Sequence, residues 1–499
     1  MGERASGRLF GLAVAAFLVL ALSPLWSTPC PALQDYPEQL FHAHVLSARG
    51  DPALDYELHY EAGLRPAYSA FYLATLLFAR FAPIEVAGRL ALALYPLLIA
   101  VLVVRIGRRL GPAHRPWGAL LLFPLAFHQQ YFLGNVQYLL SLPLLLLALF
   151  DLEDAGGDRL RPGLVLRQVV WQVLLWITHP LTTLAYVALA LVRAATDRRP
   201  RTRRWTRLAL ATGLALGLFA ASALVDQRSA PPGAGTFANA AWLPPATTLR
   251  YVALMFTGMR WSTGPEPLAV LLWSGIAAVV AAGAWLGRGG ARVPGAWPTF
   301  LALAVVALFA LPFRAAEFSY VNVRVAAIAY FLAALIVAHV RLRGSAAALL
   351  VGLAALCTLD STRKQARLSR EIEEVLPVVR RIPRNARILP LVFEASSPEL
   401  DPVWFQPHLH DHDYYHVLVG GGFSPYLLQS AVHPVRYKPG QERPAPGEFL
   451  PRRFTWDLHA ADFEYFLVRG APQAFARYVE PGCEELATSG RWVLFGRRR

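Results

Sequence analysis

Long apolar runs separated by short polar segments fill the first 360 residues of the chain. Several runs reach or approach the ~20 residues with which a helix crosses ~30 Å of hydrocarbon. The clearest are Leu9–Trp26, Val86–Val104, Leu208–Val225, Leu268–Leu286 and Val325–Val340. Only 16% of the residues are charged, against ~25% in soluble domains. The pattern therefore predicts an α-helical polytopic membrane protein.

Arginines gather in short segments between the apolar runs, notably Arg105–Arg115 and Arg193–Arg207. Positive residues in short loops mark the cytoplasmic side of a membrane. The net charge of +15 follows largely from these loops, so we expect no nucleic-acid partner. Arg4 and Arg8 place the N-terminus in the cytoplasm. The alternation of sides then requires Ala67–Phe81, which is short and flanked by prolines, to be a re-entrant or interfacial helix.

This topology gives about 11 transmembrane helices in residues 1–360, with an external loop at residues 27–85. The further crossings are Trp117–Phe132, Val136–Phe150, Val165–Thr178, Leu181–Val192, Ala296–Pro312 and Ser345–Leu359. Residues 361–499 are more polar, and a helical stretch is followed there by short strand-like runs. These runs are Ile388–Phe393, Tyr415–Val419, Phe463–Val468 and Trp492–Phe495. We expect them to form a small extracytoplasmic α/β domain.

Asp35 lies directly after the first apolar run, in the predicted external loop. An amphipathic helix that lies along the membrane surface is predicted to follow it. A carboxylate at this boundary can accept a proton from an incoming hydroxyl or hold a divalent cation. The alternative role is that of a helix N-cap, because Asp is common before a helix. The sequence leaves both roles open.

The same loop and the external helix ends offer further candidates. Glu57 and Glu61 share a face if their segment is helical. The polar residues around His128 lie at a predicted helix end, and a polar side chain at membrane depth is costly unless it faces a cavity or a partner. A solvated surface or an interhelical hydrogen bond is the alternative in each case. The catalytic candidates are Asp35, Glu57, Glu61 and His128, and the substrate-binding candidates are Tyr36, His42, Gln129, Asn135 and His179.

Two arginines, Arg314 and Arg324, lie in a predicted external turn. Arginine suits bidentate phosphate contacts, although snorkelling to lipid headgroups explains it equally well.

Histidines of the C-terminal region form the most metal-like run, with His408, His410, His412 and His416 as weak candidates for zinc or a similar ion. A polar surface loop is the alternative. Cys30 and Cys483 both fall on the predicted external side, and the sequence does not decide whether they pair.

Four short features carry a resemblance to a known superfamily. They are Asp35 with the helix after it, Ala87-Gly88-Arg89-Leu90 opening a helix that closes at Arg105–Gly111, Phe132-Leu133-Gly134-Asn135 leading to Leu142-Pro143, and the end of the external domain at Trp492–Phe495. With them the chain resembles the GT-C superfamily of membrane glycosyltransferases over about residues 1–360. It is similar to protein O-mannosyltransferases and lipid A aminoarabinose transferases, and more closely to uncharacterised bacterial relatives.

The resemblance implies a multi-pass enzyme of the bacterial inner (plasma) membrane. Such an enzyme takes a sugar from a polyprenyl-phosphate-sugar donor and passes it, with inversion, to a glycan, lipid or protein acceptor on the extracytoplasmic side. Asp35 is then the acid of the first external loop, acting as base or as a metal-assisted binder of the acceptor. A divalent metal ion is the one cofactor to consider, and membrane lipid is an expected partner.

One departure from the superfamily pattern leaves other functions open. Many relatives carry a second acid after the third crossing, where this chain has His128-Gln129-Gln130. Glu57 or Glu61 supplies that acid, or one acid suffices, or the protein is a catalytically inactive scaffold or binding protein. A transporter fits less well, because it needs ionisable residues near the bilayer midplane or inverted repeats, and the sequence shows neither.

Overall fold

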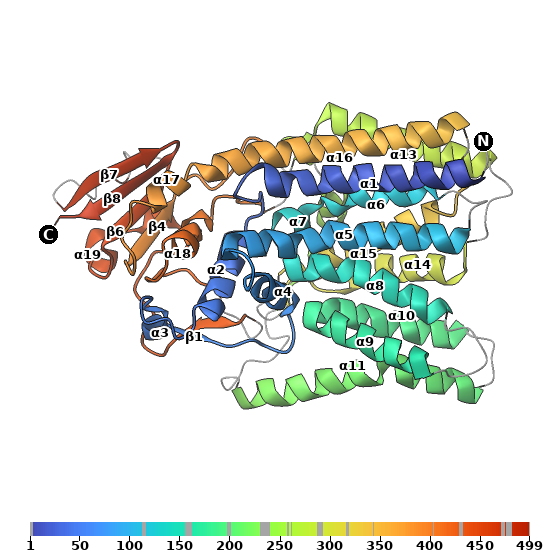
Figure 1. The fold of residues 1–499 in the computed structure, drawn as a ribbon, viewed down its shortest axis with the longest axis horizontal. Coiled ribbons are helices and arrows are strands. Elements are labelled where there is room, and N and C mark those ends of the chain that lie inside the picture. Colours follow the sequence, from blue (N-terminus) through green and yellow to red (C-terminus); the bar gives the residue numbers. More distant parts are fainter. Residues whose placement is uncertain are drawn as a thin grey trace.

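The computed structural model places the polar C-terminal residues at one end of a helical bundle (Figure 1). The structure describes residues 3–111, 116–154, 162–196, 201–229, 240–256, 259–260, 262–286, 293–315, 319–342, 344–402, 404–428, 433–470, 475 and 482–498. Both arginine-rich segments that orient the predicted topology, Arg105–Arg115 and Arg193–Arg207, lie partly outside these residues.

Helices form most of the described elements. In chain order, those of at least nine residues are α1 (Glu3–Ser27), α2 (Tyr36–Ser47), α4 (Ala70–Phe78), α5 (Ile84–Leu110), α8 (Val136–Asp154), α9 (Pro162–Thr178), α10 (Pro180–Thr196), α11 (Arg201–Ser229), α12 (Pro245–Ala253), α13 (Pro267–Leu286), α14 (Ala296–Ala310), α15 (Val321–Val337) and α16 (Gly344–Glu373). Shorter ones are α3 (Tyr56–His59), η1 (Trp117–Leu121), α6 (Leu122–Ala126), α7 (Gln129–Phe132), α17 (Leu376–Val379), η2 (Asp411–Asp413), α18 (Tyr414–Leu418), η3 (Pro451–Arg453) and α19 (Trp456–His459). The strands are β1 (Tyr60–Ala62), β2 (Met259–Arg260), β3 (Gly264–Pro265), β4 (Ile388–Val392), β5 (Val435–Tyr437), β6 (Tyr465–Arg469), β7 (Cys483–Ser489) and β8 (Trp492–Arg497).

Five helices within the described residues are long and apolar enough to cross a membrane. They contain the segments Gly7–Ser27, Ile84–Leu110, Val136–Glu153, Pro267–Trp285 and Gly344–Val379. Shorter apolar helices occupy the other predicted crossings, and the count of eleven stays a prediction. The expectation of one helix over Trp117–Phe132 is wrong, because the chain divides there into η1, α6 and α7. The division falls at His128, whose backbone is extended and pairs with Phe256.

The short apolar helix α4 has the dimensions expected of an interfacial segment. Its nine residues rise ~14 Å at 1.5 Å each, about half of the hydrocarbon thickness. Leu73 and Leu77 are exposed on it, and Phe81 is exposed just after it. The helix packs on α2 and α5, so one face is anchored while the other presents apolar side chains.

Helix α2 is not the amphipathic surface helix that the sequence predicts. Nine of its twelve residues are buried, including Glu38 and His42. The cause is a second covering layer: α4 and α5 contact it on one side, and α18 and η2 of the C-terminal region contact it on another. Figure 1 shows α2 between the bundle and this region.

The C-terminal domain, residues 374–499, contains a four-stranded sheet in the order β4-β6-β8-β7. Strands β4 and β6 are parallel, and the other neighbouring pairs are antiparallel. Every residue of β4 is buried, as expected for a strand covered on both faces. Helix α16 runs without a break across the expected boundary between residues 360 and 361, and therefore joins the bundle to this domain (Figure 1).

A second connection joins the C-terminal domain to the first loop. Strand β1 of the loop pairs antiparallel with β5, with Tyr60 opposite Tyr437 and Ala62 opposite Val435. Nearby, Asp55 Oδ1 accepts a hydrogen bond of 2.5 Å from the Gly422 N–H. Gly422 has a φ of +83°, and an added Cβ would lie 2.2 Å from the Ala386 carbonyl oxygen, so glycine is required there. Strand pairing and a hydrogen bond from a backbone N–H to a carboxylate thus hold the loop to the domain.

Candidate functional site

Asp35 is positioned by the segment that follows α7. The Gln34 N–H donates to the Phe132 carbonyl at 2.9 Å, and the Asp35 N–H donates to the Leu133 carbonyl at 3.2 Å. Gly134 has a φ of +79°, and a Cβ on it would lie 2.8 Å from the Asp35 nitrogen. Only glycine allows this close approach of two chain segments. The Gly134-Asn135 motif that the sequence singles out therefore fixes the backbone of Asp35.

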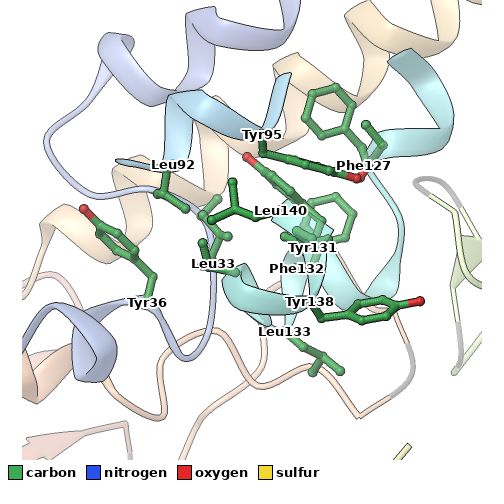
Figure 2. Close-up of a cluster of buried hydrophobic side chains, with 14 of the residues drawn as sticks. Leu33, Tyr36, Leu92, Tyr95, Phe127, Tyr131, Phe132, Leu133, Tyr138 and Leu140 are labelled. Atoms are coloured by element: carbon green, nitrogen blue, oxygen red, sulfur yellow. The ribbon is translucent and has the colours of Figure 1, made fainter. Parts of the chain in front are cut away.

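Buried aromatic side chains pack around α7 and the chain just before Asp35 (Figure 2). The ring of Tyr131 stacks on Tyr95 with the centroids 6.3 Å apart, and the ring of Phe127 meets it edge to face at 5.1 Å. Leu33 and Phe132 are fully buried beside them. Because close-packed interiors resist displacement, this aromatic cluster holds the backbone around Asp35 rigidly in place.

The side chain of Asp35 does not serve as the helix cap that the sequence left open. Asp35 occupies the N-cap position of α2, yet its carboxylate makes no capping hydrogen bond. Its Oδ1 instead accepts a bond of 3.1 Å from Gln34 Nε2, and a fifth of the side chain stays accessible. Burial raises the pKa of Asp35 to about 7, although the hydrogen bond from Gln34 and the charge of Arg324 lower it.

Arg324 lies near the start of α15 and is the positive group that acts on Asp35. It is 9% exposed, and its guanidinium donates to Gln130 Oε1 and to Asn135 Oδ1, each at 3.4 Å. Asn135 also donates to Gln130 Oε1 at 2.9 Å. Both partner residues, Gln130 and Asn135, are uncharged. Among the residues that the structure describes, no carboxylate forms an ion pair with Arg324.

His179 faces the same guanidinium at 3.4 Å through Nε2. Its Nδ1 accepts a hydrogen bond of 3.1 Å from the Leu181 N–H, so a neutral ring carries its proton on Nε2. The Arg324 guanidinium and His179 Nε2 are then two donors that face each other. Such a pair is suited to a shared acceptor, for example an oxygen of a phosphate group.

Two tyrosines frame this pair of donors. The rings of Tyr68 and Tyr138 meet the His179 ring edge to face at 5.4 and 5.2 Å, and the Tyr138 hydroxyl donates to the Arg324 carbonyl. Burial raises the pKa of Tyr68, the charge of Arg324 lowers it and the charge of Asp35 raises it, so Tyr68 lies within electrostatic reach of both groups.

On the other side of Asp35, acids and histidines of α2 and the C-terminal domain meet. His410 Nε2 lies 3.5 Å from Asp35 Oδ1, and His410 Nδ1 lies 3.2 Å from Glu38 Oε2 and 3.3 Å from Glu448 Oε1. Glu38, His410 and Asp413 each offer a ligand atom within 4.8 Å of the others. We call Glu38, His410, Asp413 and Glu448 the acid–histidine cluster.

The cluster combines several acids with little compensating positive charge. Within the described ranges, neither Lys nor Arg forms an ion pair with Glu38, Asp413 or Glu448. Burial and the neighbouring carboxylates raise the pKa of Glu38 and of Asp413 well above the usual range. Burial, with a contribution from Asp35, raises the pKa of Glu448 to about 8. Burial lowers the pKa of His410 to about 3. The ring of His410 is therefore neutral, and its contacts are not ion pairs.

Several predicted site residues lie elsewhere. Glu57 and Glu61 do not share a helical face, because α3 ends at His59 and β1 begins at Tyr60, and both acids are exposed. Tyr36 packs against Gly88 and the Phe71 ring.

Three other candidates, His128, Gln129 and Arg314, are held by contacts with backbone groups. His128 caps α7 by accepting from the Gln130 N–H at 3.2 Å, and the Gln129 N–H donates to the Met255 carbonyl at 2.7 Å. Arg314 is exposed, and its backbone pairs with Ala241. None of their described contacts reaches Asp35. His42, by contrast, adjoins the cluster, with Nε2 3.8 Å from Glu38 Oε1.

The four candidate metal histidines do not converge. His408 contacts Asp411 Oδ2 at 2.8 Å and Glu371 Oε2 at 3.4 Å, and the ring of His416 stacks on Phe41 with centroids 4.2 Å apart. His412 Nε2 lies 3.3 Å from Asp413 Oδ1. Of the four, only His410 has a described contact with Glu38 of α2. The three cysteines are free and buried, so Cys30 and Cys483 do not pair.

Sequence reasoning missed Glu38, Asp413, Glu448 and Tyr68. A signal existed for the first two, since Glu38 belongs to the acid-rich loop and Asp413 to the histidine run. Glu448 stands alone in a Pro-rich stretch, and nothing local marks it or Tyr68. A search of protein-family models and of curated proteins found no match to this chain.

Proposed function

We propose that the protein is a membrane glycosyltransferase that moves a sugar from a polyprenyl-phosphate-linked donor to an acceptor hydroxyl on the external face of the membrane. The observation that supports this most is Arg324, a buried cation that acts electrostatically on Asp35 and whose hydrogen-bond partners among the described residues are all uncharged. A buried charge without a directly paired counterion costs several kcal/mol of free energy. An anionic phosphate offsets that cost at Arg324.

In this proposal each group has a role. Arg324 and His179 Nε2 bind the phosphate, and Asp35 accepts the proton of the acceptor hydroxyl. The acceptor oxygen forms a bond to the anomeric carbon as the bond from that carbon to the phosphate oxygen breaks, and the electron pair leaves with the phosphate. Arg324 stabilises the negative charge that develops there. One displacement with one base inverts the anomeric configuration.

The lipid chain of the donor has an apolar surface available. Helix α4 begins after Ser69, whose N–H donates to the Ile177 carbonyl at 2.7 Å, two residues before His179. The exposed Leu73 and Leu77 follow on α4. An isoprenoid chain that lies along these side chains brings its phosphate to the Arg324 end of the site.

A binding protein without catalysis is the second candidate. The observation in its favour is the extent to which the C-terminal domain covers the site, since Gln34 Oε1 accepts a hydrogen bond of 2.7 Å from the Gln406 N–H. A binding protein retains the donor unchanged, whereas a transferase consumes it.

The test uses the full chain in lipid nanodiscs with a polyprenyl phosphate carrying a radiolabelled sugar. We expect release of the sugar to water or to an added hydroxyl acceptor. Asp35→Asn should lower the rate by about 10²- to 10⁴-fold, the range for loss of a general base, while donor binding persists. Arg324→Gln should weaken donor binding instead.

Glu57→Gln is the matched control, because it removes an exposed acid of the same loop. Its rate should equal that of the unmodified chain. Full activity of Asp35→Asn would remove Asp35 from the mechanism, and donor that binds but is never consumed would establish the binding protein.

A further inference from the structure

We propose that Glu38, His410 and Asp413 bind a divalent transition-metal ion that connects α2 to the C-terminal domain. Their ligand atoms lie within 4.8 Å of one another. Ligands at the 2.0–2.2 Å that zinc favours lie roughly 3–4 Å apart, so a small contraction closes the site. The inference is independent of the proposed transferase activity.

Unpartnered polar atoms provide the second observation. Glu38 Oε2, His410 Nδ1 and both carboxylate oxygens of Asp413 are buried without a hydrogen-bond partner, and the three residues are at most 3% exposed. A buried polar atom that lacks a partner costs about 1–3 kcal/mol. Four such atoms at one point indicate a ligand that all of them share, and a cation is the species that carboxylates and a neutral imidazole have in common.

A fourth ligand is available from Glu448. Its Oε1 lies 3.3 Å from His410 Nδ1 and is itself buried without a hydrogen-bond partner. Three carboxylates and one imidazole form a set with no sulfur ligand, which suits Zn²⁺ or Mn²⁺ rather than Cu⁺. Each acid that ionises to bind the metal brings one negative charge, and a divalent ion offsets the resulting repulsion among them.

The neighbouring groups orient the ligands as they do around established metal sites. The Leu428 N–H donates to Glu38 Oε1, which leaves Oε2 for the ion. His412 Nε2 lies 3.3 Å from Asp413 Oδ1. An ion on His410 Nδ1 fixes the ring proton on Nε2, the atom that faces Asp35 Oδ1 at 3.5 Å. The ion thereby holds a donor against the carboxylate of Asp35.

The experiment measures metal content and thermal unfolding of the purified full chain in detergent micelles. After chelation and dialysis against Zn²⁺ or Mn²⁺, we expect about one ion per chain by elemental analysis. We also expect the ion to raise the midpoint of unfolding. Glu38→Gln and Asp413→Asn keep the shape of each side chain, and each should weaken the affinity at least about tenfold.

The matched controls are Glu57→Gln, an exposed acid of the first loop, and Asp457→Asn, an acid of the C-terminal domain at the start of α19. Both should bind the ion as the unmodified chain does. If the unmodified chain takes up no more Zn²⁺ or Mn²⁺ than the double variant Glu38→Gln/Asp413→Asn, with both eluting as folded species in gel filtration, the site does not exist. Loss of transferase activity bears only on the proposed function, since metal content is measured without substrate.

Discussion

Single residues of the first loop derive their properties from burial rather than from their own type. Asp35 would be an ordinary surface acid or a helix cap if the loop were solvated. In the folded chain its backbone is fixed by Gly134, its Oδ1 lies 3.5 Å from His410 Nε2, and the charge of Arg324 lowers its pKa. A glycine is therefore as informative about this site as any of its charged residues.

The close approach at Gly134 predicts a large effect of one methyl group. Gly134→Ala should destabilise the protein by about 1–3 kcal/mol, because a left-handed φ is unfavourable for alanine and the added Cβ meets the Asp35 nitrogen at 2.8 Å. Thermal unfolding in micelles measures the change.

Gly163→Ala in α9 is the matched control, since nothing lies within 4 Å of a Cβ added there. Alanine favours a helix over glycine by up to ~1 kcal/mol, so this variant should be as stable as the parent or more so. Equal stability of Gly134→Ala and Gly163→Ala would show that the segment moves aside without cost.

Elements of the first loop are held to the C-terminal domain by few but specific contacts. At α3, Asp55 accepts from Gly422 N–H and lies 3.3 Å from His59 Nε2. Burial raises the pKa of Asp55, but the hydrogen bonds from His59 and from the Gly422 N–H outweigh it, and the pKa falls below its usual value. The ionised carboxylate therefore stabilises the attachment of the loop.

The sign of this shift sets a pH dependence. A lowered folded-state pKa gives stability that is present above the unfolded pKa of ~3.9 and is lost as the pH falls through the folded pKa. Asp55→Asn should cost about 1.5–3 kcal/mol at pH 7, as for a hydrogen bond to a charged group. The difference from the parent should shrink as the pH falls below about 4.

Limited proteolysis of the loop and thermal unfolding from pH 3 to 7 measure both effects. Asp51→Asn is the matched control, because the hydrogen bond from the Ala53 N–H to Asp51 stays within the loop. A constant difference between Asp55→Asn and the parent over the whole pH range would contradict the role of the charge.

The apolar pattern of the sequence predicts most of the helices of the molecule, but it does not predict which residues meet in the site. The predicted crossings other than Trp117–Phe132 lie on single helices, since the period and length of apolar runs are local properties of the sequence. The burial of α2 and the contact of His410 with Glu38 depend on a domain that folds over the loop from the far end of the chain. Nothing near His410 distinguishes it from His408, whose partners are Asp411 and Glu371.

The orientation in the membrane is testable because the three native cysteines are buried. We expect Glu57→Cys to react with a membrane-impermeant maleimide in intact bacterial cells. Arg108→Cys, which replaces an exposed arginine near the end of α5, should react only after lysis. Labelling in the opposite order would invert the predicted topology.

The acid–histidine cluster also imposes an order on biosynthesis. Glu38 receives a hydrogen bond from Leu428, 390 positions later, an interval that a ribosome covers in roughly 20–80 s at 5–20 residues per second. During that time the first loop is already made, while the domain that covers α2 does not yet exist. A chain that stops before residue 400 thus leaves its acids and apolar side chains open to proteases, so full-length synthesis is a condition for the survival of the first loop.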